Sequence, residues 1–117
     1  MTKPWLYFGM LFSCFCWHTE DHYLPSVNLL HAGAPKTWYG VPAAGAKKFE
    51  RLLKQSVPEL FREEPGLLYG LVTMLSPSLC AQAGVPICRV VQAPGEVRSG
   101  WREACLFKEK EGGWGKG

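Results

Sequence analysis

An apolar, aromatic run over residues 5–17 leads directly into a polar stretch, and this junction constrains the fold more than any other part of the sequence. We expect residues 6–15 to form one or two strands bent at Gly9, because such side chains favour buried strands. Side chains two residues apart on an extended backbone point to the same face. His18 and Glu20, at the polar end of the run, are therefore predicted to converge.

These two side chains are suited to metal binding. Imidazole and carboxylate both belong to the 2-His-1-carboxylate triad of non-haem Fe(II) oxygenases, which leaves coordination positions open for substrate and oxygen. A His-x-Glu pattern also arises by chance, and such a pair alone at a strand end is more often a hydrogen-bonded structural feature. The metal interpretation therefore depends on the surrounding sequence.

The size and composition indicate one folded domain. A chain of 117 residues that is 47% hydrophobic and 13% aromatic can bury a core and differs from disordered sequences. Its net charge of +3 is spread along the chain without a clustered basic stripe, so direct nucleic-acid binding is not indicated.

Cysteine usage and the apolar run bear on location. Five cysteines without a Cys-x-x-Cys pair predict neither a disulfide framework nor a zinc ribbon, which favours reduced thiols inside a cell. Lys3 and the apolar run after it resemble the charged and apolar regions of a secretory signal, but no small-residue cleavage site follows. The run is shorter than the roughly 20 apolar residues that cross a bilayer, so no membrane contact is expected.

Two further strands are predicted before residue 42. Residues 26–31 alternate polar and apolar side chains, which places Ser26 and Asn28 on one face toward a polar site. A turn at residues 33–35 separates this strand from the next one, residues 37–41.

The period then changes to a helical one over residues 43–84. Phe49 and Leu53 lie at helical spacing opposite basic residues, which predicts an amphipathic surface helix. Residues 85–97 return to strand composition, and residues 98–117 are rich in glycine and mixed charge, which predicts a mobile tail. The prolines expected to begin further short helices are Pro58, Pro65 and Pro77.

Several ordered blocks of this sequence resemble the JmjC domain of histone lysine demethylases, and most closely the JARID1-type enzymes that act on methylated lysine 4 of histone H3. The resemblance implies a mainly β fold with helical insertions, part of a double-stranded β-helix of the jelly-roll or cupin-like kind. It implies a partial JmjC domain over residues 1–97 and fails from Arg98 onward. The blocks that carry the likeness are residues 7–10, 15–21, 26–42, 58–61, 71–74, 84–86 and 92–97.

The resemblance also implies site residues. It places Fe(II) on His18 and Glu20 and the cosubstrate 2-oxoglutarate on Asn28 and Lys36. A lysine ammonium can neutralise the distal carboxylate of 2-oxoglutarate, and an amide and a hydroxyl can donate further hydrogen bonds. Taken alone, Lys36 would be an ordinary lysine at a strand end. The neighbours implied in the site are Ser26 and the aromatic walls Phe15 and Trp38.

The implied reaction is oxidative demethylation, in which an N-methyl group of lysine is hydroxylated and the unstable product loses formaldehyde. The implied partner is the methyl-lysine of a histone H3 tail, and the implied location is the nucleus. Iron and 2-oxoglutarate supply the difficult chemistry, while protein groups hold the methylated lysine near the open metal position.

One departure from the family pattern concerns the second metal-binding histidine. The family places it beyond residues 92–97 in a His-Ser-Gly-Phe context, whereas this sequence has no histidine after His31. Residues 98–101 resemble that context after a deletion, but a guanidinium has no lone pair for a metal. His22 would lie about 13 Å from His18 along a strand. We expect His22 and His31 to be structural or rim residues.

The sequence leaves three functions open. The first is an Fe(II)/2-oxoglutarate dioxygenase domain, expected to be incomplete as a fragment, a truncated isoform or a mispredicted gene product. The second is a catalytically inactive JmjC-like module that contacts chromatin proteins. The third, a cupin-like metal enzyme for a small molecule, is disfavoured by residues 34–42, which are demethylase-like in detail.

Overall fold

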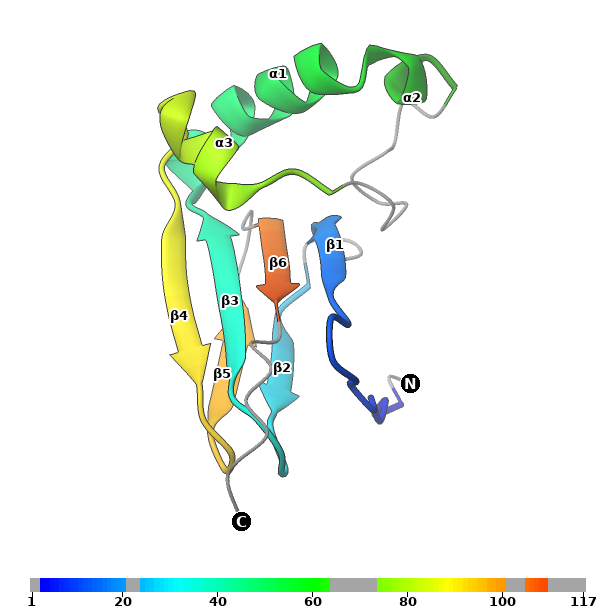
Figure 1. Cartoon of the computed structure of the whole chain (residues 1–117), viewed down its shortest axis with the longest axis vertical. Coiled ribbons are helices and arrows are strands. Elements are labelled where there is room, and N and C mark those ends of the chain that lie inside the picture. The colour runs from blue at the N-terminus through cyan, green and yellow to red at the C-terminus, as the bar shows by residue number, and fades with distance from the viewer. Residues whose placement is uncertain (1–2, 21–23, 64–73, 101–104, 110–117) are drawn as a thin grey trace.

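The computed structural model describes residues 3–20, 24–63, 74–100 and 105–109. Within these ranges the chain forms two antiparallel sheets and a group of short helices (Figure 1). The strands are β1 (Phe15–His18), β2 (Ser26–Leu29), β3 (Lys36–Val41), β4 (Cys88–Gln92), β5 (Val97–Gly100) and β6 (Cys105–Glu109). The helices are the 3-10 turn η2 (Ala43–Gly45), α1 (Ala46–Ser56), α2 (Pro58–Glu63) and α3 (Pro77–Gln82).

The strands pair across long stretches of sequence. One sheet has the order β1-β6-β3-β4, and the other contains β2 and β5. We expected the strands before residue 42 to cluster with one another. That expectation is wrong, because β1, β2 and β3 each pair with a strand from residues 88–109. Hydrophobic pattern predicts where strands occur, but it does not specify their partners.

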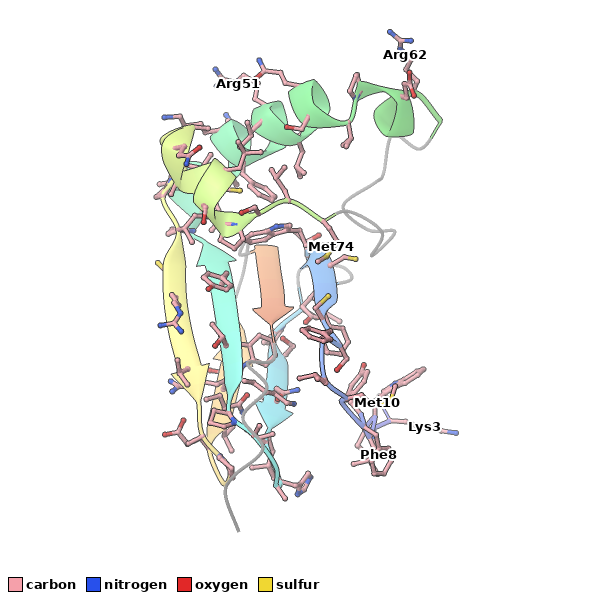
Figure 2. All side chains as sticks on the ribbon, viewed as in Figure 1. Lys3, Phe8, Met10, Arg51, Arg62 and Met74 are labelled. Carbon is pink, nitrogen blue, oxygen red and sulfur yellow. The ribbon has the colours of Figure 1, made fainter. Side chains whose placement is uncertain are left out.

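The expected strand over residues 6–15 is largely absent. Only β1 forms, from Phe15, and the chain before it turns where the backbone N–H of Ser13 donates to the Met10 carbonyl at 3.1 Å. Phe8 is 89% exposed, and its side chain and that of Met10 project away from the sheets (Figure 2). Apolar composition alone did not produce a strand here, because a strand forms only where a neighbouring strand pairs with its backbone, and this segment belongs to neither described sheet.

The structure also differs from the mobile tail expected after residue 97. Two of the strands, β5 and β6, lie in this part of the sequence, and β6 pairs with β1 on one side and β3 on the other. Backbone pairing on both sides stabilises β6 despite a composition without clear strand periodicity. The rest of the expected tail lies outside the described residues.

The predicted helical segment is confirmed where it is described. Phe49 and Leu53 of α1 are buried, and the ammonium of Lys54 lies 2.6 Å from a carboxylate oxygen of Glu50 on the exposed face. Helix α2 begins at Pro58 and α3 at Pro77, as predicted. The helix expected after Pro65 lies outside the described residues. The helices gather at one end of the strands (Figure 1).

The apolar core lies where these helices cover the sheet. Trp17 of β1 is fully buried, and its ring packs against Phe49 with 4.8 Å between the ring centroids. Its indole N–H donates to the Leu75 carbonyl at 2.8 Å, which satisfies the one polar atom of this large side chain. The remaining core residues are Val41, Leu53, Cys80 and Val85.

Gln92, at the end of β4, joins the two sheets and is fully buried. Its side-chain oxygen accepts a hydrogen bond from the indole N–H of Trp38 at 2.8 Å. Its side-chain nitrogen donates to the carbonyls of Asn28 at 3.0 Å and Glu96 at 2.8 Å. Because both ends of the amide are satisfied, burial of this polar group is compatible with a stable fold.

Candidate functional site

A cavity of about 400 Å³ opens between the two sheets and is lined mainly by residues of strands β1 to β5. Six of the seven site residues predicted from the sequence line it: Phe15, His18, Glu20, Ser26, Asn28 and Trp38. Lys36, the seventh, is not among the lining residues, although its ammonium contacts the lining residue Asn28. The lining residues that the sequence did not predict are Tyr7, Val27, Val90, Arg98 and Ser99.

An irregularity in β1 aims two of these side chains into the cavity. Phe15 lies opposite Lys108 and His18 opposite Leu106, so three residue steps along β1 match two steps along β6. In a regular strand, residues three apart point to opposite faces. The extra residue of a β-bulge allows both Phe15 and His18 to face the cavity, while Trp17 between them is buried in the core.

The imidazole of His18 is oriented by the backbone. Its Nδ1 lies 2.8 Å from the Cys16 carbonyl oxygen, and because a carbonyl only accepts, Nδ1 carries the proton in this contact. The lone pair of neutral imidazole is then on Nε2, which lies 3.9 Å from Oε1 of Glu20. This distance exceeds a hydrogen bond. The predicted convergence of the two side chains is therefore present, with space between the donor atoms.

Cys16 contributes to the site through its backbone carbonyl, because its side chain is not among the residues that line the cavity. Burial raises the pKa of its thiol above the ordinary value, and the neighbouring Cys14 adds to the effect.

Strand β2 presents its polar residues as the alternation predicted. Ser26 and Asn28 are half-buried and line the cavity. The ammonium of Lys36 donates to Oδ1 of Asn28 at 3.4 Å, a long hydrogen bond. Lys36 and Trp38 lie two residues apart on β3 and so share a face.

The aromatic wall of the cavity is held in place by specific contacts. The Tyr7 and Phe15 rings meet edge to face with 5.3 Å between their centroids. Trp38 is fixed through its indole N–H by Gln92. No periodic pattern in the sequence marked Tyr7 as a cavity residue, and the role of Gln92 depends on the two sheets that it joins.

Arg98 was treated as the point where the family likeness ends, yet it lines the cavity. It lies opposite Asn28 in the β2–β5 register, so the two side chains share a face. Its Nη2 donates to the Val91 carbonyl and to Oε2 of Glu96, both at 3.1 Å. The register of β5 could have identified Arg98, but β5 was not expected as a strand beyond residue 97.

The fit of an iron ion to these residues is partial. His18 and Glu20 offer two donors of the right chemical type, and the Nδ1 contact is the support that metal-binding histidines usually have. The described ranges contain no group of three or more His, Cys, Asp or Glu that could hold a metal. His31 is exposed and does not line the cavity, and His22 lies outside the described residues.

None of the helices in the described ranges has the length and apolar character needed to span a membrane.

Comparison with known proteins identifies relatives along most of the chain. The family model described as JmjC domain, hydroxylase, matches residues 5–97. Lysine-specific demethylase JMJ17 of Arabidopsis thaliana is 53% identical over 95 residues, which cover 81% of this chain and 8% of that protein. Lysine-specific demethylase 5D of Homo sapiens is 52% identical over 96 residues, covering 82% of this chain and 6% of that protein.

A third relative, JMJ16 of Arabidopsis thaliana, is 57% identical over 93 residues, or 80% of this chain and 8% of that protein. The chain thus spans less than a tenth of the length of each of these relatives. The residues that the family model matches include every cavity residue up to residue 97. The chain belongs to the JmjC domain family of hydroxylases.

Proposed function

We propose that this chain carries the iron and 2-oxoglutarate site of a histone lysine demethylase domain. One observation carries the proposal: the oriented imidazole of His18 and the carboxylate of Glu20 converge in a cavity shared with Ser26, Asn28 and Trp38. JmjC membership implies a cupin-like fold. In our proposal the two sheets, joined by Gln92, are the two faces of a partial double-stranded β-helix.

In this proposal the metal ligands are Nε2 of His18 and the carboxylate of Glu20. The Cys16 carbonyl keeps the proton on Nδ1, which leaves Nε2 free to donate its lone pair. Glu20 is more exposed than His18, with 38% of its side chain accessible against 16%. Its carboxylate can therefore adjust toward an ion, while the imidazole stays fixed.

The cosubstrate is assigned to the other side of the cavity. The Lys36 ammonium neutralises one carboxylate of 2-oxoglutarate, and Asn28 and Ser26 supply hydrogen bonds. Phe15 and Trp38 enclose the carbon chain and exclude water. When bound, iron and 2-oxoglutarate activate oxygen for hydroxylation of an N-methyl group, after which formaldehyde leaves.

The substrate is assigned from the family and the names of the relatives. Two of them are named lysine-specific demethylases, which supports methyl-lysine as the substrate class. We propose the histone H3 tail as the partner and the nucleus as the location. The β2–β5 side of the cavity contributes the polar residues Ser26, Asn28, Arg98 and Ser99, which can hydrogen-bond a peptide.

A second candidate is a catalytically inactive JmjC-like module that contacts chromatin proteins. The observation that favours it is the missing third metal donor within the described residues. Loss of a supporting residue beyond the ligands typically weakens metal binding or activity about 10–100-fold, and loss of a ligand is expected to cost more. We therefore expect weak iron binding and no turnover from the isolated chain.

Metal titration of the purified chain tests the proposed site. Under anaerobic conditions, Fe(II) binding followed by calorimetry should weaken at least about tenfold in His18→Ala and in Glu20→Gln. His31→Ala is the matched control, because His31 is exposed and outside the cavity. Equal binding by the native chain and His18→Ala would refute the metal assignment.

Formaldehyde release separates the two candidate functions. The assay uses trimethylated histone H3 peptide with Fe(II), 2-oxoglutarate, oxygen and ascorbate. No release, together with His18-dependent iron binding, supports an inactive module in this chain. Turnover abolished by His18→Ala would instead show an active demethylase whose third ligand comes from outside the described residues.

A further inference from the structure

We propose that the outer side of α1 is a docking surface for the phosphate backbone of duplex DNA, formed by Lys47, Lys48 and Arg51. These three side chains are called the basic face below. The sequence as a whole did not indicate nucleic-acid binding, but the fold of α1 brings the cations of one short segment together. The inference does not depend on the function proposed for the cavity, because the basic face belongs to the helical end of the molecule (Figure 1).

The three cations share one side of α1 because of their helical spacing. With about 3.6 residues per turn, Lys47 and Arg51 lie one above the other, and Lys48 lies beside them. Phe49 and Leu53 occupy the opposite side of the helix, which is buried in the core. All three cationic residues are exposed, and Arg51 projects away from the strands (Figure 2). The basic face is therefore accessible from solvent.

The described acidic residues of α1 do not neutralise the basic face. The helix contains one carboxylate, that of Glu50, and this carboxylate pairs with Lys54 at 2.6 Å. Among the residues that the structure describes, no side-chain hydrogen bond or ion pair engages Lys47, Lys48 or Arg51. Four cations and one carboxylate give α1 a net charge of +3, which equals the net charge of the whole chain. The excess positive charge is thus concentrated in this one helix.

Helix stability does not explain these cations. Lys47 and Lys48 lie in the first turn of α1, where there is no acidic residue. The first turn carries the partial positive charge of the helix dipole, so cations are unfavourable there. Arg51, four residues after Lys47, adds a like-charge pair, which also destabilises a helix. An anionic partner would relieve both repulsions, which favours binding.

The side chains of α1 favour a duplex over other anionic partners. Its apolar side is used in the core, so none of it remains to enter a lipid surface. Single strands bind by stacking bases on exposed aromatic side chains, whereas the aromatic residue of α1, Phe49, is fully buried. Protein partners are held mainly by apolar or aromatic anchors, and every exposed residue of α1 is polar or charged. Cations without apolar neighbours suit the closely spaced phosphates of a duplex.

The test is fluorescence anisotropy of a short labelled duplex of arbitrary sequence, titrated with the whole chain at several salt concentrations. Three phosphate contacts predict a slope of about −2.7 for the logarithm of the binding constant against that of salt concentration. This slope corresponds to a loss of about 40-fold in affinity between about 50 and 200 mM salt. A second duplex of unrelated sequence should bind equally well, because phosphate contacts carry no sequence information.

Substitutions by glutamine assign the contacts to the basic face. Arg51→Gln should weaken binding and reduce the steepness of the salt dependence by about 0.9, which leaves a loss of about 12-fold over the same salt range. Lys47→Gln, Lys48→Gln and Arg51→Gln combined should abolish measurable binding. Lys3→Gln is the matched control, because it removes one positive charge far from α1, in the segment before β1 (Figure 2). Thermal unfolding shows that each variant is folded.

The inference is overturned if no duplex binds at low salt, or if the native chain and the combined variant bind equally. It is also overturned by tighter binding to a different anion. Preference for polyglutamate would show an acidic protein partner. Preference for vesicles of phosphatidylserine and phosphatidylcholine in equal amounts would show a membrane surface. None of these results bears on the iron site, which is judged by metal titration.

Discussion

Trp17 and His18 are neighbours in β1, but they belong to regions of the molecule that are held together differently. Trp17 lies in the apolar core beneath α1, where it packs against Phe49. His18 lines the cavity, where positions are fixed by hydrogen bonds to Cys16 and through Gln92. We infer that most of the free energy of folding comes from the core under the helices. The cavity end depends on a few polar contacts and can change with less effect on stability.

The largest expected effect is that of Trp17→Ala. Truncating a buried aromatic side chain costs about 3–5 kcal/mol of unfolding free energy, a large part of what a small domain possesses. The Leu75 carbonyl would also lose its indole partner. Urea denaturation followed by circular dichroism should show a lower midpoint or an unfolded chain.

His18→Ala provides the matched comparison from the next residue. It removes one hydrogen bond at the edge of the cavity, so we expect a loss of about 1 kcal/mol. If the two substitutions cost the same, the division between a stabilising core and a polar cavity would be incorrect.

A loss smaller than that of Trp17→Ala but larger than that of His18→Ala is expected from Gln92→Leu, which has a similar volume. The substitution leaves the indole N–H of Trp38 and the carbonyls of Asn28 and Glu96 without their partner. Unpaired buried groups cost about 1–3 kcal/mol. Thermal unfolding should report this loss, and near-ultraviolet circular dichroism should report a less ordered Trp38. An unchanged spectrum and stability would show that Gln92 does not join the sheets.

The smallest expected effect is a difference in the rates at which the cysteines of the unmutated chain react with an alkylating reagent. Cys14 and Cys88 are exposed, whereas burial raises the pKa of the Cys80 thiol in the core and of the Cys16 thiol beside the cavity. A higher pKa leaves less thiolate at a given pH, and the thiolate is the reactive form. Iodoacetamide labelling followed by mass spectrometry should therefore modify Cys14 and Cys88 first and Cys80 last. In urea the differences should disappear; labelling of Cys80 as fast as Cys88 in the folded chain would contradict the assigned core.

The spacing and type of neighbouring residues correctly predicted the structural features that depend on contacts within a short stretch of chain. The polar face of β2, the buried face of α1 and the proline-initiated helices α2 and α3 were all evident from spacing and residue type. His18 and Glu20 were expected to converge and do so. Each of these features depends on residues within a few positions of one another.

The features that were missed depend on distant parts of the chain. A bulge in β1 is defined only by its register with β6, and the role of Gln92 exists only where β4 meets β2. Strand β5 places Arg98 beside Asn28, although the sequence around Arg98 has no strand period. Conversely, the apolar residues 5–14 favour a strand but belong to neither of the two described sheets.

The position of β6 has a consequence for how the molecule folds. Among the strands that the structure describes it comes last in the sequence, yet it lies between β1 and β3 in the sheet. During synthesis, β1 and β3 emerge long before the strand that separates them, so they must remain unpaired or form a premature pairing that later has to open. Non-local pairing of this kind slows folding and prolongs the exposure of strand edges. Refolding should therefore be slow for a chain of this size, and ribosome-bound intermediates that lack β6 should depend on chaperones.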